Sequence, residues 1–156
     1  MIICVRYGEI LKKSLLTIPN IGVINFHPSL LPKYKGLGPI FQALLHNENE
    51  IGFSFHYIDE DVDTGEIIKR QKIKTEKNES VSRITIRVHI AGGYELLSVI
   101  NNIKKGNKKT EEVIQDAGNF FSWPEKKYVK KFIQSNKKYI EFRDFLSLVF
   151  YNPKKF

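Results

Sequence analysis

Cysteine is almost absent from this sequence, because Cys4 is the only one among 156 residues. A single cysteine excludes both an internal disulfide framework and a metal site built from several thiolates. Long apolar runs are also missing, since no segment approaches the roughly 18 residues that a membrane-spanning helix needs. The N-terminal residues carry neither a basic lead nor a small-residue cleavage site, so we expect no secretory signal. These features predict a cytoplasmic protein with no membrane contact.

Two widespread site motifs are missing as well. The sequence has no P-loop, and the run Gly36-Leu37-Gly38 lacks the residues that would complete a dinucleotide-binding fingerprint. The four histidines do not have the HExxH spacing that is typical of zinc sites. We therefore expect no bound metal ion.

Acidic residues are scarce in the last third of the chain. Residues 104–156 carry 13 Lys and Arg against 6 Asp and Glu, whereas residues 1–103 carry 12 against 11. A basic segment that follows a near-neutral body suits an anionic partner such as RNA or a nucleotide. A solvated helix face explains the same charges equally well, so charge alone does not identify the partner.

Hydrophobic patterns predict an α/β fold. We expect strands over 1–5, 21–26, 51–58 and 66–73, and helices over 11–16, 81–103, 126–138, 141–151 and from Pro39 onward. Ser80 is the expected N-cap of the longest helix. Alternation of aromatic and polar residues predicts that the strand over 51–58 is half-buried. The order of elements implies a mostly parallel sheet with a late hairpin in residues 1–105, followed by a basic, aromatic and helical tail over 106–156.

The most informative segment is 25–36, which reads NFHPSLLPKYKG. Asn25 and His27 lie two positions apart in a strand, so their side chains project from the same face. They lie at the carboxyl end of a buried strand, where open α/β sheets bind ligands. Together with a later aspartate in residues 61–65, the amide and the imidazole form a set that suits acyl transfer. An isolated Asn-x-His pair is also typical of a strand-end cap.

Residues 25–36 together with 61–65 (DVDTG) resemble the formyltransferase family, which includes methionyl-tRNA, glycinamide ribonucleotide and amino-sugar formyltransferases. The family pattern is Asn-x-His-Pro-Ser-Leu-Leu-Pro, then a basic-glycine pair and a later Asp-x-Gly. All three parts are present, and the 38 residues from Asn25 to Asp63 match the family spacing. The resemblance covers residues 1–105 and implies part of a Rossmann-like formyltransferase domain.

The resemblance implies an enzyme that moves a formyl group from the co-substrate 10-formyltetrahydrofolate to a primary amine, either methionyl-tRNA or a nucleotide-linked amino sugar. Asn25 and a protonated His27 would donate hydrogen bonds to the oxyanion, and Asp63 would accept the amine proton through water. The folate would lie against Tyr7, Gly8, Ile10 and Leu11 in one loop and Asp59, Glu60, Asp61 and Val62 in another. Ser29, Lys35 and Gly36 would belong to the substrate loop, with Ser29 most simply a loop-shaping hydroxyl. Formyltetrahydrofolate hydrolysis and a catalytically inactive folate- or nucleotide-binding module are the alternatives.

Two departures from the family lead to further expectations. In the family the Asn-x-His motif lies much later in the chain, so we expect an N-terminally incomplete domain. Its first strand would present an apolar sheet edge that favours self-association, and the chain alone would bind folate weakly and transfer formyl groups poorly. The tail after Gly106 is too short for the tRNA-binding β-barrel of methionyl-tRNA formyltransferases. Its aromatic residues Phe120, Phe121 and Trp123 either stack on a base or sugar or anchor the tail to the domain.

Overall fold

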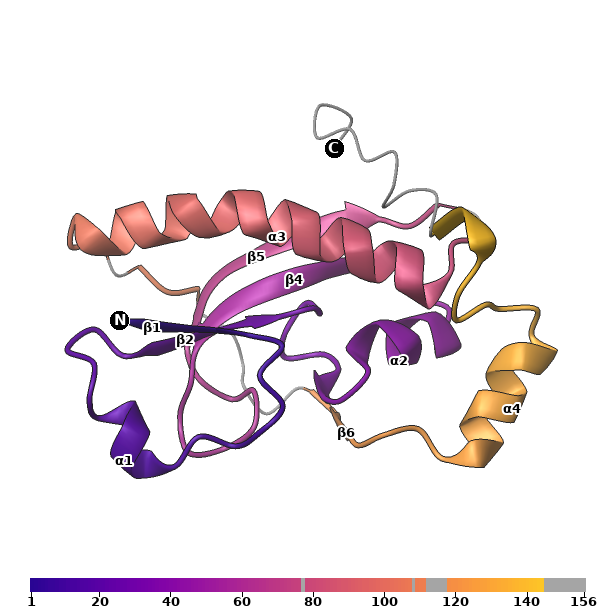
Figure 1. The fold of residues 1–156 in the computed structure, drawn as a ribbon, viewed down its shortest axis with the longest axis horizontal. Helices are drawn as coiled ribbons and strands as arrows, with labels where there is room; N and C mark the ends of the chain where they lie inside the picture. The colour runs from indigo at the N-terminus through magenta and orange to yellow at the C-terminus, as the bar shows by residue number, and fades with distance from the viewer. Residues whose placement is uncertain (77, 108, 112–117, 145–156) are drawn as a thin grey trace.

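A computed structural model describes residues 1–156 except 77, 108, 112–117 and 145–156. Its centre is a sheet in the order β1-β2-β4-β5 (Figure 1). These strands are β1 (Ile2–Val5), β2 (Val23–His27), β4 (Glu50–Tyr57) and β5 (Ile67–Lys74). The α/β class, the early parallel pair and the late hairpin are confirmed, because β1 runs parallel to β2 and β4 antiparallel to β5. The sheet contains fewer parallel pairs than expected, since β4 also runs antiparallel to β2.

The helices lie close to where the sequence predicts them. They are α1 (Lys13–Leu16), α2 (Pro39–Leu45), α3 (Val81–Lys104) and α4 (Lys126–Gln134). Ser80 caps α3 as expected, because its hydroxyl accepts a hydrogen bond from the Arg83 N–H at 3.0 Å. The expected helix over 126–138 ends earlier, at Gln134, and the one over 141–151 lies mostly outside the described residues. Within the described part of the chain, no helix has the length and apolar character needed to cross a membrane.

Aromatic side chains on one face of the sheet form the core. The Phe26 ring of β2 lies 5.4 Å from that of Phe53 and 5.5 Å from that of Phe55 in β4. Helix α3 covers this face with Ile84 and Val88, and Figure 1 shows it lying along β4 and β5. Each fully buried side chain of this size contributes about 1.5–3 kcal/mol. This packing holds β2 and β4 in one register.

The opposite face of β4 is buried too, so the prediction of a half-buried strand is wrong. Ser54 is 0% exposed and His56 1%. The cause is the segment after β2, which folds back over this face. The Ser54 hydroxyl donates to the Ser29 carbonyl at 2.7 Å and accepts from the Leu31 N–H at 3.0 Å. A face that reads as solvent-facing from its polar residues is therefore covered by a hydrogen-bonded loop.

The tail packs against the same loop. Its strand β6 (Phe120–Phe121) pairs in parallel with β3 (Lys35–Gly36). Farther along, the Phe132 ring of α4 lies 4.6 Å from that of Phe41 in α2. Of the two interpretations of the tail aromatics, anchoring describes Phe121, while Phe120 and Trp123 remain exposed.

Candidate active site

Four polar side chains converge on the covered face of the sheet. Asp63, from the loop between β4 and β5, places its carboxylate among the other three. Its oxygens lie 3.3 Å from Asn25 Nδ2, 3.3 Å from His27 Nδ1 and 3.4 Å from His56 Nε2. The structure therefore brings together the three predicted catalytic residues and adds a histidine that the sequence analysis did not select.

Strand register explains why His56 belongs to the cluster. Asn25 pairs with His56 across β2 and β4, which puts the two side chains next to each other on one face. Asn25 Nδ2 lies 3.2 Å from His56 Nε2. The signal in the sequence was His56 itself, which lies among the aromatic residues of this strand. A buried histidine needs a hydrogen-bond partner.

The position of Asp63 is set by backbone constraints. Its φ of 55° lies in the left-handed region that few non-glycine residues occupy. The Gly36 N–H donates to its Oδ2 at 2.8 Å. Two residues later, a Cβ on Gly65 would lie 1.8 Å from the Tyr57 carbonyl oxygen, so only glycine fits there. The Asp-Thr-Gly sequence thus turns the loop tightly against β4 and presents the carboxylate to the cluster.

The electrostatic balance keeps Asp63 ionised. Burial on its own would raise the pKa of this carboxyl group, but the hydrogen bond from His56, the charge of His27 and the Gly36 N–H together lower the pKa to about 2. Burial lowers the pKa of His27 below its ordinary value, against the opposing effects of Asp63 and the Tyr34 carbonyl. At neutral pH the cluster holds a fixed negative charge beside two imidazoles.

Both ring nitrogens of His27 already have a partner. Nε2 donates to the Tyr34 carbonyl at 2.9 Å, while Nδ1 faces the Asp63 carboxylate. The His27 side chain is 5% exposed. A hydrogen bond from His27 to a substrate oxygen therefore requires one nitrogen to exchange its present partner.

The substrate-loop residues lie directly beside this cluster. The Ser29 hydroxyl donates to the Lys33 carbonyl at 2.7 Å, which agrees with a loop-shaping role. Lys35 is buried, and Gly36 holds Asp63 through its N–H. Gly36 therefore contacts a predicted catalytic residue.

The predicted folate residues lie in two surface segments. In the first, Tyr7 and Ile10 are 57% and 76% exposed. The remaining members are exposed or half-buried: Gly8, Leu11, Asp59, Glu60, Asp61 and Val62. An ion pair of 2.5 Å between Lys13 and Glu60 links α1 to the second segment. Both segments are accessible to a ligand, and their folate contacts stay a prediction.

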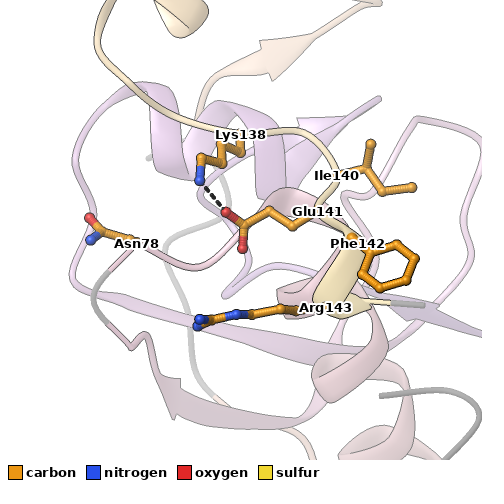
Figure 2. A pocket seen from close by; sticks show the side chains of 6 residues that line it. All are labelled: Asn78, Lys138, Ile140, Glu141, Phe142 and Arg143. Carbon is orange, nitrogen blue, oxygen red and sulfur yellow. Dashed lines mark hydrogen bonds and ion pairs between the residues drawn. The ribbon is translucent and has the colours of Figure 1, made fainter. Parts of the chain in front are cut away.

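Two cavities lie outside the cluster. One, of about 610 Å³, is lined by Asn78, Lys138, Ile140, Glu141, Phe142 and Arg143, and Figure 2 shows these residues around the ion pair of Lys138 with Glu141. The other, of about 540 Å³, lies on the loop over 28–34 and includes Arg70 and Glu111. Neither cavity is lined by the four cluster residues. Among the described residues, no group of three or more His, Cys, Asp or Glu side chains is arranged to hold a metal ion.

Comparison with known protein families shows which family this chain belongs to. The family profile described as formyl transferase matches residues 1–100, which include the whole cluster. The chain belongs to the formyl transferase family. Similar sequences include the methionyl-tRNA formyltransferase of Staphylococcus aureus strain Newman, which is 39% identical over 116 residues. The match covers 74% of this formyl transferase chain and 37% of that relative, so the chain spans little more than a third of its length.

Solved structures confirm the Rossmann-like formyltransferase fold. The formyltransferase PseJ from Anoxybacillus kamchatkensis, in complex with UDP-4,6-dideoxy-4-formamido-L-AltNAc and tetrahydrofolate, superposes with a TM-score of 0.72 at 23% identity over 85% of this chain and 67% of its own. An N-formyltransferase from Helicobacter canadensis, in complex with folinic acid and dTDP-3-aminofucose, gives a TM-score of 0.56 at 28% identity over 62% and 37%. This formyl transferase chain therefore shares its fold with proteins solved with folates and nucleotide sugars.

Proposed function

We propose that this chain carries the formyl-transfer centre of an N-formyltransferase that moves a formyl group from 10-formyltetrahydrofolate to a primary amine. The observation that supports it most directly is the convergence of Asn25, His27 and His56 on the Asp63 carboxylate. An acyl-transfer transition state requires hydrogen-bond donors that are held in place and shielded from solvent. Here the Asp63 carboxylate holds the donors, and the side chains of His27, His56 and Asp63 are 5%, 2% and 10% exposed.

The proposed reaction proceeds through a tetrahedral intermediate. The amine nitrogen attacks the formyl carbon and forms the new C–N bond, while the carbonyl electron pair moves onto oxygen. Collapse of this oxyanion breaks the bond from the formyl carbon to N10 of the folate. N10 gains a proton and tetrahydrofolate leaves, while the attacking nitrogen loses a proton. No covalent bond to the protein is formed, so neither Cys4 nor Ser29 has a nucleophilic role.

Asn25 is the first oxyanion donor in this scheme. Its amide nitrogen carries two hydrogens, and the partners around it are the Asp63 carboxylate and His56. When His56 Nε2 is protonated it donates to Asp63 instead of accepting from Asn25, which releases one amide hydrogen for the oxyanion. His27 becomes the second donor when it exchanges the Tyr34 carbonyl for the formyl oxygen.

Asp63 acts chiefly through its charge. With a pKa of about 2 it stays ionised at neutral pH and stabilises positive charge on either imidazole as the oxyanion forms. The ammonium formed by the attack loses its proton to a water molecule that donates a hydrogen bond to the Asp63 carboxylate.

The proposed acceptor is an amine attached to an anionic group, either methionyl-tRNA or a nucleotide-linked amino sugar. Sequence similarity to methionyl-tRNA formyltransferase supports the first, and the nucleotide sugars bound by PseJ and the Helicobacter canadensis protein support the second. The excess of basic residues over 104–156 suits both, because both carry phosphates.

The test is a single-turnover assay of the full chain at high protein concentration. It is mixed with 10-formyltetrahydrofolate and, in parallel, with methionyl-tRNA, a dTDP-amino sugar or glycinamide ribonucleotide, and formylated amine is measured by mass spectrometry. We expect product with one amine and none with Asp63→Asn. Formate release without an added amine would instead indicate hydrolysis, and folate binding without either product would indicate an inactive binding module.

A further inference from the structure

We infer that Phe121, in tail strand β6, is a positioning residue for the candidate active site and acts through the loop that contains β3. Its consequence for catalysis rests on the proposed function, whereas its structural effect does not. Phe121 lies outside residues 1–100, which the family profile matches. The tail would then complete the geometry of a site whose four side chains all come from the matched part.

The first step of the argument is that a three-residue segment holds two members of the cluster. The Tyr34 carbonyl accepts the hydrogen bond from His27 Nε2 at 2.9 Å. Two residues later, the Gly36 N–H donates to Asp63 Oδ2 at 2.8 Å. A shift of this segment would therefore change the orientation of both the imidazole and the carboxylate.

The second step is that this segment has an unfavourable backbone conformation. Tyr34 has a φ of 58° and Gly36 a φ of 85°. A non-glycine residue in the left-handed region is unfavourable and persists only where surrounding contacts hold it. The conformation of Tyr34 thus depends on what packs against the segment.

The third step is that β6 supplies those contacts. The Lys35 N–H donates to the Asn119 carbonyl at 3.1 Å, and the Leu37 N–H donates to the Phe121 carbonyl at 2.7 Å. The Phe121 ring stacks on the Tyr34 ring with centroids 5.6 Å apart and an angle of 29° between planes. A Cβ on Gly36 would lie 2.3 Å from the Phe121 oxygen, which shows how closely the two strands approach. The Phe121 ring therefore packs on the first residue of the segment, and the Phe121 carbonyl holds the residue that follows the segment.

The experiment measures the segment and the cluster directly by NMR, with no need for activity. Phe121→Ala removes the ring that stacks on Tyr34, and Phe121→Tyr keeps it. Phe142→Ala is the matched control, because it removes the same side chain from an exposed position of the tail, 77% exposed, beside the cavity in Figure 2. In Phe121→Ala we expect hydrogen exchange of the Gly36 amide to accelerate about tenfold or more. The pKa of the Asp63 carboxyl should rise from about 2 toward its ordinary value, since it loses the Gly36 hydrogen bond.

In Phe121→Tyr and Phe142→Ala, the exchange rate of the Gly36 amide and the pKa of Asp63 should stay as in the wild type. An unchanged Gly36 exchange rate and an unchanged Asp63 titration in a folded Phe121→Ala protein would overturn the inference. If Phe121→Ala does not fold, Phe121→Leu serves instead, because it keeps most of the buried volume and removes only the ring stacking. Where the wild-type chain transfers formyl groups, Phe121→Ala should lower kcat and leave the folate KM unchanged. Changed NMR values in a chain that transfers nothing would support the positioning role and count against the proposed function.

Discussion

Asn25 Nδ2 lies 3.2 Å from His56 Nε2, across the antiparallel pair of β2 and β4. His56 Nδ1 lies 2.8 Å from the Tyr57 carbonyl, which can only accept, so Nδ1 carries a proton. In the neutral ring, Nε2 is therefore the acceptor for the Asn25 amide. This contact orients the Asn25 side chain with its nitrogen toward Asp63, which makes it a donor rather than an acceptor in the cluster.

The first prediction follows from this contact. His56→Phe should lower the rate of formyl transfer by about tenfold or more, because Asn25 loses the partner that orients its amide. Folate affinity should change little, since the His56 side chain is only 2% exposed. The control is His89→Gln, which alters an imidazole on α3 outside the cluster. Transfer at the wild-type rate by His56→Phe would contradict this role.

The second prediction concerns the oxyanion donors. Asn25→Ala and His27→Ala should each slow single-turnover formyl transfer by about 10²–10³, the usual cost of losing one such donor. Asn101→Ala, which removes an exposed amide from α3, should leave the rate unchanged. Folding of each variant is checked by circular dichroism. Near-normal rates in both Asn25→Ala and His27→Ala would reject the catalytic assignment.

The third prediction is a pH dependence of stability. The pKa of Asp63 is about 2 in the folded chain against an ordinary value of 3.8, so ionised Asp63 stabilises the fold above about pH 4, and this contribution is lost as the pH falls toward 2. Its size is about 2 kcal/mol. His27 acts in the same direction at higher pH, because its pKa is lowered and the unfolded chain takes up its proton first as the pH falls.

Urea unfolding of wild type and Asp63→Asn at pH 6 and at pH 2.5 checks this. The wild type should be the more stable at pH 6, and the difference should fall to about a third at pH 2.5. Asp61→Asn, at an exposed position of the same loop, should have the stability of the wild type at both pH values. A difference between wild type and Asp63→Asn that does not depend on pH would show that the carboxylate charge is not what stabilises the loop.

The fourth prediction tests the basic tail. Changing the four exposed lysines of α4 to glutamate should raise the KM for an anionic acceptor and flatten its salt dependence, while the rate at saturation stays the same. These residues are Lys126, Lys127, Lys130 and Lys131. Reversing four exposed lysines outside the tail, Lys12, Lys33, Lys72 and Lys74, controls for total charge. Equal effects of the two sets would mean that α4 has no specific role.

The fifth prediction is self-association through β1. This strand lies at the edge of the sheet, and Ile2 and Val5 are 41% and 48% exposed. Apolar edges of this kind pair with other chains. Val5→Lys should shift the chain toward monomer in analytical ultracentrifugation, whereas Leu97→Lys, on α3 and 64% exposed, should not. A wild-type chain that stays monomeric at all concentrations would contradict the prediction.

Local sequence was enough to predict much of the fold and half of the site. The ends of strands and helices follow from Pro39, from the Ser80 cap and from the spacing of apolar residues, all of which act within a few positions. Asn25 and His27 could be placed on one face because the side-chain period of a strand is two. The family resemblance then added Asp63, which lies far away in the sequence.

Only the tertiary structure decided which distant groups complete the cluster. His56 meets Asn25 because β4 pairs antiparallel with β2, and that pairing depends on the common aromatic core rather than on any local signal. Gly36 holds Asp63, and Phe121 packs on Tyr34, through contacts between segments that are far apart in the sequence. Such contacts form when the chain buries apolar surface as a whole, so the sequence around each residue predicts its own conformation but not its partners.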